Sequence, residues 1–284
     1  MLLQQIGAQS YRSGAGAKFA TLIAAVRASL SGRWGDHLIR TSSILTLLAA
    51  WYIGAAYLPA SVMPAPHVVA RVLATEIRSF GIWNDVAITL TRIALAFSIA
   101  MSIALILGFA MGLSKTAECF FEIWIIGAIT MPSLVLILTI YMVVGLNDRA
   151  AILGAALPVV PILTINIWEA IKGIDQKLID MSKAYHAGRV RIIASVIAPQ
   201  IAPALLASAR FGLGLIWKMV LFVELLGRSD GVGYKIEFYY QSFNMSEVMA
   251  YALLFVLIML FLEIVALGKL ERYLFNWRPA QRRF

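Results

Sequence analysis

Residues 93–113 read IALAFSIAMSIALILGFAMGL, and this stretch decides the fold class because it contains no charged residue. An α-helix needs about 20 mainly apolar residues to cross a bilayer, and this stretch supplies them. The whole chain has the same character: 61% of its 284 residues are hydrophobic and 14% are charged. Soluble domains carry about 25% charged residues. The sequence therefore predicts an all-α, polytopic membrane protein rather than a soluble globular one.

Six stretches are long and apolar enough to be predicted as membrane spans. They cover residues 42–59, 93–113, 123–145, 150–169, 203–226 and 248–268. The third contains Pro132, and the fourth contains Pro158 and Pro161. Proline inside a helix kinks or breaks it, so we expect bends in these two spans.

Lysine and arginine are distributed unevenly between the predicted spans. Residues 1–40, 170–200 and 268–284 hold five each, fifteen of the 24 in the chain, whereas the segments between spans on the other side hold six. Cytoplasmic loops of membrane proteins collect basic residues. The pattern predicts that both termini are cytoplasmic. The net charge of +9 is therefore explained by basic residues in cytoplasmic segments, and it does not indicate nucleic-acid binding.

The chain is predicted to have three parts. Residues 1–40 form a basic cytoplasmic segment, residues 41–270 a transmembrane domain with a cytoplasmic loop at 170–200, and residues 271–284 a basic cytoplasmic tail. Residues 17–31 fit an amphipathic helix on the membrane surface, and a solvated tail is the alternative. A cleaved signal peptide is disfavoured because Arg27 interrupts the apolar core that such a peptide needs.

The loop between the fourth and fifth spans contains a polar island, Asp175–Pro203. Leu178, Met181 and Tyr185 recur there at helical spacing, while Lys177, Asp180, Lys183 and His186 lie mostly elsewhere on the helix. The pattern predicts a short amphipathic helix. Such a helix fits either a groove on a partner protein or the bilayer surface, and the pattern alone does not separate the two.

Part of this island, DMSKAYHAGRVRIIASVIAP, resembles the cytoplasmic loop of permease subunits of ABC importers. In that loop Glu-Ala-Ala is followed by three residues, a Gly and a run that ends in Ile-x-Leu-Pro. Asp180 falls at the Glu position, Met181 and Ser182 at the Ala positions, and Ile197-Ala198-Pro199 at the end. His186 replaces the Gly. We expect Gly188 to provide the turn instead, with a slightly longer helix before it.

Other motifs resemble the nitrate/sulfonate/taurine-type permeases, and the resemblance covers about residues 60–279. The residues that carry it are Thr89, Leu90 and Arg92, the run Leu107–Ser114, Arg210, Gly212, Gly214, Trp217, Glu224, the run Gly231–Tyr234 and the run Leu270–Pro279. Spans three and four fit the family pattern worst.

The resemblance implies a type I ABC importer permease in the bacterial plasma (inner) membrane. Such a permease works as a pair, with two ATPase subunits on the cytoplasmic face and an external solute-binding protein that delivers a small anionic solute. The island would be the coupling helix in the ATPase groove, formed by Leu178, Asp180, Met181, Ser182, Lys183, Tyr185, His186, Gly188 and Pro199. ATP and Mg would be bound by the partner ATPases, with no cofactor in this chain. The sequence agrees, because it contains no GxxxxGK[ST] phosphate loop.

Four charged residues fall within or near the predicted spans five and six: Arg210, Lys218, Glu224 and Glu263. A charge at mid-membrane costs about 2.5–3.5 kcal/mol on insertion scales, so it normally faces protein or water. We expect Lys218 to form a structural ion pair with Glu263 or Glu224. The alternative is that Lys218 or Arg210 faces the translocation pathway and assists an anionic substrate.

Two other functional classes were weighed. A membrane-embedded enzyme would need clustered catalytic side chains at one membrane face, and the sequence shows none. The single Cys119 and the scattered histidines likewise predict no metal site. A stand-alone secondary carrier or channel would leave the coupling-type island without a role.

Overall fold

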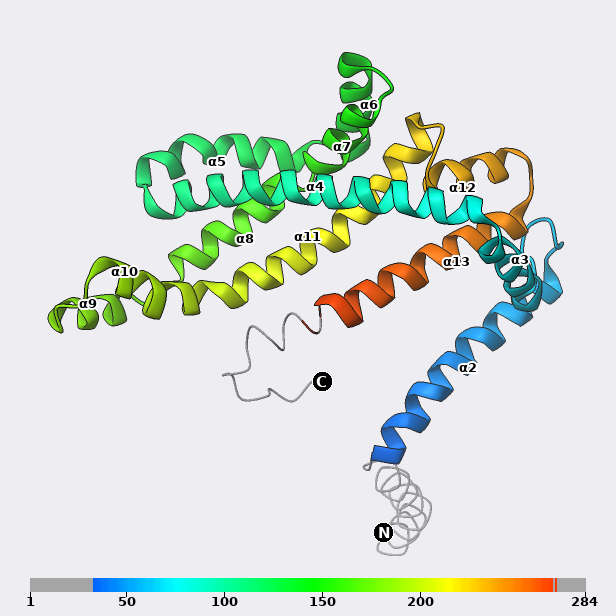
Figure 1. Cartoon of the computed structure of the whole chain (residues 1–284), viewed down its shortest axis with the longest axis horizontal. Helices are drawn as coiled ribbons and strands as arrows, with labels where there is room; N and C mark the ends of the chain where they lie inside the picture. Colours follow the sequence, from blue (N-terminus) through cyan, green and yellow to red (C-terminus); the bar gives the residue numbers. More distant parts are fainter. Residues whose placement is uncertain (1–32, 268, 270–284) are drawn as a thin grey trace, which may run out of the picture. The chain divides into compact units, whose positions relative to one another are not determined.

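The computed structural model describes residues 33–267 and 269. The residues that it describes are helical or lie in the connections between helices, as predicted (Figure 1). The chain divides into two compact units, Met1–Val68 and Val69–Phe284. The predicted surface helix at 17–31, the tail at 271–284 and the motif Leu270–Pro279 lie outside the described residues.

The first unit contains helix α2 (Arg33–Tyr57) and the start of helix α3 (Pro66–Arg78). Its window Leu38–Tyr57 is long and apolar enough to cross a membrane. The indole nitrogen of Trp51 donates a hydrogen bond to the carbonyl of Pro64, and the Tyr52 and His67 rings stack. These contacts fold the chain after α2 back against the end of the helix.

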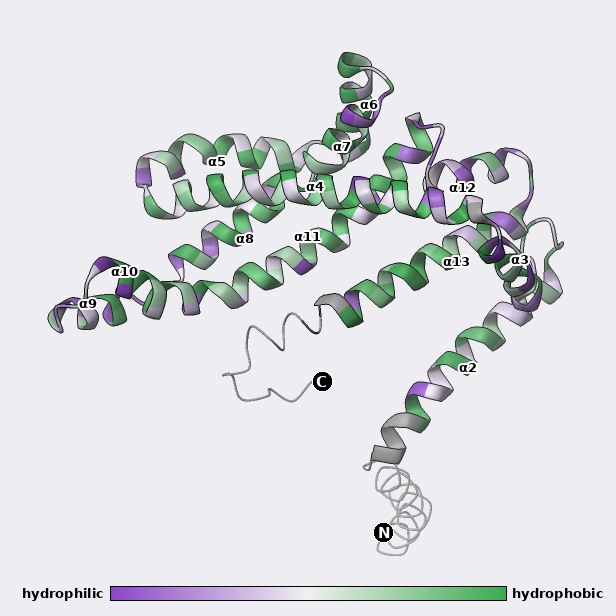
Figure 2. Cartoon of the chain, viewed as in Figure 1, coloured by the Kyte–Doolittle hydropathy of each residue, from purple (hydrophilic) through white to green (hydrophobic). Residues whose placement is uncertain are grey.

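The second unit is built around helix α4 (Phe80–Leu113), which contains the stretch 93–113. Helix α8 (Val160–Lys172) packs along α4, and helix α11 (Ala198–Gly227) contacts both. The close approach depends on glycine: a Cβ on Gly108 would lie 2.7 Å from Ile167, and one on Gly112 would lie 2.6 Å from Ile171. In Figure 2 the helices are green, the colour of hydrophobic residues, along most of their length, which fits helices in contact with lipid.

Two of the six predicted spans are bent pairs of helices. Helices α5 (Lys115–Thr130) and α6 (Ser133–Val144) meet at 97°, and α7 (Asp148–Ala156) and α8 meet at 41°. Pro132 breaks the first pair because the residue before a proline is pushed to an extended conformation, as Met131 is with ψ 127°. Within residues 33–267, four single helices remain that could cross a membrane, or up to six spans if each bent pair is one span. The bend expected at Pro132 is therefore confirmed, and the helix pair that contains the predicted span 123–145 begins earlier, at Lys115.

The remaining elements lie at the two ends of the second unit. Helices α9 (Gln176–Ala184) and α10 (Arg189–Ile192) lie at one end, and a π-helical turn, Ile193–Ile197, joins them to α11. Helix α12 (Val232–Gln241) lies at the opposite end, followed by α13 (Met245–Phe261), which continues as a π-helical turn, Leu262–Leu267 (Figure 1).

Candidate functional site

Helix α9 is the predicted coupling helix, and no residue of it is buried. The side chain of Asp175 caps its N-terminus by accepting from the Lys177 amide at 2.9 Å. The three residues of the predicted apolar ridge, Leu178, Met181 and Tyr185, are all exposed, and Tyr185 is 81% exposed. An exposed apolar ridge of this kind fits either a groove on a partner protein or the bilayer surface.

The other predicted docking residues surround this ridge. Asp180 pairs with Lys183 at 3.2 Å, and the Ser182 hydroxyl donates to the Leu178 carbonyl. Pro199 lies directly after the π-helical turn, within the continuous helix Arg189–Gly227.

The turn after α9 is made by His186 and not by Gly188. His186 has φ +55°, whereas Gly188 is extended with φ −63° and ψ 153°. The amide of His186 donates to the Lys183 carbonyl and that of Ala187 to the Ser182 carbonyl, the pattern of a Schellman cap. The expectation that Gly188 takes over the turn is therefore wrong. His186 adopts the left-handed conformation that glycine adopts most easily, although this conformation is costly for a residue with a Cβ.

The Gln200 side chain connects the start of α9 to the membrane helix α11. The amide of Asp175 donates to the Gln200 side-chain oxygen at 2.8 Å, and the Gln200 side-chain nitrogen donates to the Val196 carbonyl at 3.1 Å. Val196 lies in the π-helical turn, where the backbone hydrogen bonds are displaced by one residue. Gln200 thus ties the start of α9 to the irregular start of α11.

The opposite end of the unit holds a buried charge cluster centred on Arg92 of α4. Its guanidinium donates to Glu224 of α11 at 2.9 Å and to Asp148 at the start of α7 at 2.9 Å. It also pairs with Asp230 in the loop between α11 and α12. Glu224 is 0% exposed and Arg92 is 3% exposed. One guanidinium therefore joins α4, α7, α11 and the α11–α12 loop.

The loop after α11 closes over Glu224. The Gly233 amide donates to the Glu224 carboxylate at 2.9 Å. The Thr89 hydroxyl lies 2.9 Å from that carboxylate and accepts from the Val232 amide. A Cβ on Gly231 would lie 2.5 Å from Glu224, and Gly231 has φ +98°, so only glycine fits.

The cluster explains why several separate sequence motifs occur together. Thr89, Arg92, Glu224 and the run Gly231–Tyr234 were each recognised in the sequence, but nothing in their spacing showed that they meet. Asp148 and Asp230 were missed. Two positions in the sequence could have indicated their role: Asp230 directly precedes the glycine motif, and Asp148 is the first residue of α7.

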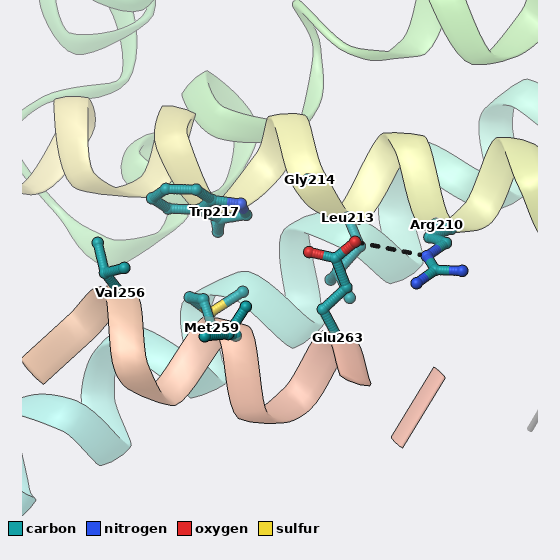
Figure 3. A pocket seen from close by; sticks show the side chains of 8 residues that line it. Arg210, Leu213, Gly214, Trp217, Val256, Met259 and Glu263 are labelled. Carbon is teal, nitrogen blue, oxygen red and sulfur yellow. Dashed lines mark ion pairs between the residues drawn. The ribbon is translucent and has the colours of Figure 1, made fainter. Parts of the chain in front are cut away.

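The predicted ion pairs of Lys218 are wrong. Glu224 pairs with Arg92, and Glu263 lies 3.5 Å from Arg210. Figure 3 shows Arg210 and Glu263 pointing toward each other between α11 and α13, at a partly open cavity of about 180 Å³ that Trp217 also lines. Within the described residues, the recorded contact of the Lys218 ammonium is the Trp217 ring, 5.6 Å from its centroid.

A smaller charge cluster lies toward the α9 end of the unit. Glu118 at the start of α5 pairs with Lys172 of α8 at 2.7 Å and with Lys115 at 2.9 Å. Lys172 also lies over the Trp168 ring. This cluster holds α5 against α8. In the part of the chain that the structure describes, no group of three or more His, Cys, Asp or Glu residues could hold a metal ion.

Residues 100–269 match the family described as "Binding-protein-dependent transport system inner membrane component". The chain belongs to this family. The permease is 29% identical over 236 residues to the putative aliphatic sulfonates transport permease protein SsuC of Escherichia coli (strain K12), with 82% of this chain and 89% of SsuC covered. It is 27% identical over 258 residues to the taurine transport system permease protein TauC of the same organism, with 87% of this chain and 94% of TauC covered.

A solved structure confirms the fold of the permease. The inward-facing MetNI methionine ABC transporter contains a chain that superposes with a TM-score of 0.52 at 20% identity, covering 73% of the permease and 96% of that chain. The type I permease architecture is thereby confirmed, as are the expected family and the role as a membrane-spanning subunit of an importer. As a family member with apolar helices the permease is a multi-pass inner-membrane protein.

Proposed function

We propose that the permease forms, with a second copy of itself, the translocation pathway of an ATP-driven importer for a small anionic solute such as a sulfonate or taurine. Two ATPase subunits bind ATP and Mg and hydrolyse the ATP, while an external binding protein delivers the solute. The names of the relatives, an aliphatic sulfonates permease and a taurine permease, support the solute class.

The observation that carries this proposal is the exposed apolar ridge of α9. Leu178, Met181 and Tyr185 are exposed and recur at helical spacing. They belong to α9 and its C-cap, and α9 lies at the end of the unit opposite α12 (Figure 1). A helix of this length is only marginally stable in water on its own. Its exposed apolar ridge therefore needs a partner to cover it. Basic residues concentrate in the segment 170–200, which favours a cytoplasmic position for α9 and for both termini.

The proposal is tested with the permease, its ATPase and its binding protein reconstituted in lipid vesicles. Tyr185→Ala and Leu178→Ala should each lower ATP-dependent uptake of taurine or ethanesulfonate at least about tenfold, because each removes a docking anchor worth about 1.5–3 kcal/mol when buried. Uptake and ATP hydrolysis should fall together.

Gln176→Ala is the matched control. Gln176 is exposed on the same helix but lies on the opposite face by helical spacing. Its replacement should leave coupled uptake within about twofold of the unaltered complex. Normal uptake by Tyr185→Ala and Leu178→Ala, or an equal loss in all three variants, would exclude docking through this ridge.

A further inference from the structure

Lys218 lies on an exposed stripe of α11. Five exposed residues of this helix recur at helical spacing along one face, whereas the opposite face, with Gly212, Ile216 and Val220, is buried against the rest of the unit. The stripe consists of Ala207, Phe211, Lys218, Phe222 and Leu225. Lys218 is the one charged residue in this otherwise apolar set.

Lys218 is too deep for its charge to reach the membrane surface. It precedes the end of α11 at Gly227 by nine residues, about 14 Å along the helix axis. The hydrocarbon core is about 30 Å thick, so Lys218 lies near its centre if Gly227 marks one boundary. A lysine has only a four-carbon stem, which does not bridge this distance. The ammonium therefore needs water, protein or a ligand around it.

The described residues of the unit do not neutralise this charge. Glu224 is fully buried against Arg92, and Glu263 faces Arg210. Among the residues that the structure describes, no carboxylate lies within salt-bridge distance of Lys218. Contact of the stripe with the same stripe of a second copy would add another Lys218 rather than an acid. A lone cation in this position is complementary to an anion that enters from water.

We propose that Lys218 faces the aqueous translocation pathway and selects solutes that carry a negative charge. Phe211 and Phe222 lie two turns before and one turn after Lys218 on the same face. The site therefore suits a small organic anion, a sulfonate or carboxylate with a short apolar body that contacts the rings. This inference rests on the proposed transport function. It goes further in assigning charge selection to a residue of the permease itself, in addition to the binding protein.

The test uses the chemistry of a single introduced thiol. The natural chain has one cysteine, so Cys119→Ser gives a background without thiols. Phe222→Cys in that background is treated, in open membrane fragments that hold the full chain, with the anionic reagent 2-sulfonatoethyl methanethiosulfonate or the cationic reagent 2-(trimethylammonio)ethyl methanethiosulfonate. Mass spectrometry of the intact protein follows both rates. The rate ratio, anionic over cationic, is compared with that of a free thiol in water.

Both reagents should react, and the ratio should exceed that of the free thiol. Lys218→Gln should lower the ratio roughly tenfold, because it removes a unit charge one helical turn away. Lys218→Arg should preserve it. Ser242→Cys, an exposed position at the end of α12 and outside the stripe, is the control, and its ratio should not change with Lys218→Gln.

Two results would overturn the inference. One is the absence of reaction with either reagent at both Phe222→Cys and Phe211→Cys, which places the stripe against lipid or protein. The other is a ratio that Lys218→Gln leaves unchanged. The second cysteine position keeps the test decisive if one variant does not fold. Labelling needs neither ATP nor a partner, so a failure of coupled uptake with normal labelling would count against the proposed function alone.

Discussion

The guanidinium of Arg92 donates a hydrogen bond of 2.9 Å to the carboxylate of Glu224, 132 residues later in the chain. Both side chains are buried. The pair joins the two longest helices of the described chain, α4 and α11, at the end of the unit opposite α9. The cost of burying the two charges is offset because Thr89, Gly233, Asp148 and Asp230 supply further hydrogen bonds.

Replacing one partner of this pair should be strongly destabilising. Arg92→Met leaves Glu224 buried without its cation and should lower the free energy of unfolding by about 3–5 kcal/mol. The measurement is the thermal unfolding midpoint of the purified permease in detergent. Arg71→Gln is the control, since Arg71 is exposed on α3 and its loss should cost less than about 0.5 kcal/mol. Equal midpoints for the two variants would show that the cluster contributes little to stability.

Gly231 should not tolerate even a methyl group. Gly231→Ala places a Cβ 2.5 Å from the Glu224 carboxylate in a residue with φ +98°, so the loop must move away from the cluster. We expect a loss of about 2–4 kcal/mol in the same unfolding measurement.

Gly214→Ala is the matched comparison, and Gly214 lies on α11, the helix that carries Glu224. A Cβ on Gly214 would meet no atom within 4 Å, and Gly214 lies within α11. Because alanine favours helix over glycine, this change should be neutral or stabilise by about 1 kcal/mol. A stability of Gly231→Ala similar to that of Gly214→Ala would contradict the close approach of the loop to Glu224.

Glycine at position 186 should tighten the turn that ends the coupling helix. A left-handed conformation costs a residue with a Cβ about 1–2 kcal/mol, and His186→Gly removes that cost. The stabilisation is local, so it should appear as slower hydrogen exchange of the His186 and Ala187 amides, measured by mass spectrometry of peptides from the purified permease.

Tyr185→Gly should have the opposite effect on the same peptides. Tyr185 has φ −82°, which requires no glycine, and the change only increases the freedom of the unfolded turn. Faster exchange in both variants would mean that His186 does not hold the left-handed turn.

Gln200 should transmit movement between α9 and α11. Gln200→Leu removes the acceptor for the Asp175 amide and the donor to the Val196 carbonyl. Each hydrogen bond contributes about 0.5–1.5 kcal/mol, so hydrogen exchange of the Asp175 amide should accelerate about tenfold. In the reconstituted importer, ATP hydrolysis should continue while uptake per ATP falls. Gln200→Glu retains the acceptor and should preserve the protection of Asp175, whereas equal exchange in all forms would rule out the link.

The bends in spans three and four were only partly accessible from the sequence. Pro132, Pro158 and Pro161 mark where helices break, because proline removes a backbone donor and restricts its neighbour. The angle that follows is set by packing between helices, and so 97° at one break and 41° at the other could not be foreseen. The same limit applies at His186, where the hydrogen bonds of the cap outweigh the preference of a residue with a Cβ for negative φ.

Charge pairing was the weakest part of the prediction, for a physical reason. Sequence distance along one helix pair suggested Glu224 or Glu263 as partners for Lys218, but buried charges pair with whatever the tertiary fold brings within a few ångströms. Arg92 reaches Glu224 because the middle of α4 packs against the last turns of α11. Once both acids are engaged elsewhere, Lys218 is left on the exposed stripe of α11.

The sequence by itself determined that this chain is an all-α membrane protein of the importer permease family, and it located α9. Those properties depend on apolar run length, helical periodicity and the local order of motifs, which are written in neighbouring residues. Only the tertiary structure decided that Thr89, Arg92, Glu224 and Gly231 form one cluster and that Lys218 stands apart from it. Contacts between residues more than a hundred positions apart depend on how helices pack, and no local pattern encodes that packing.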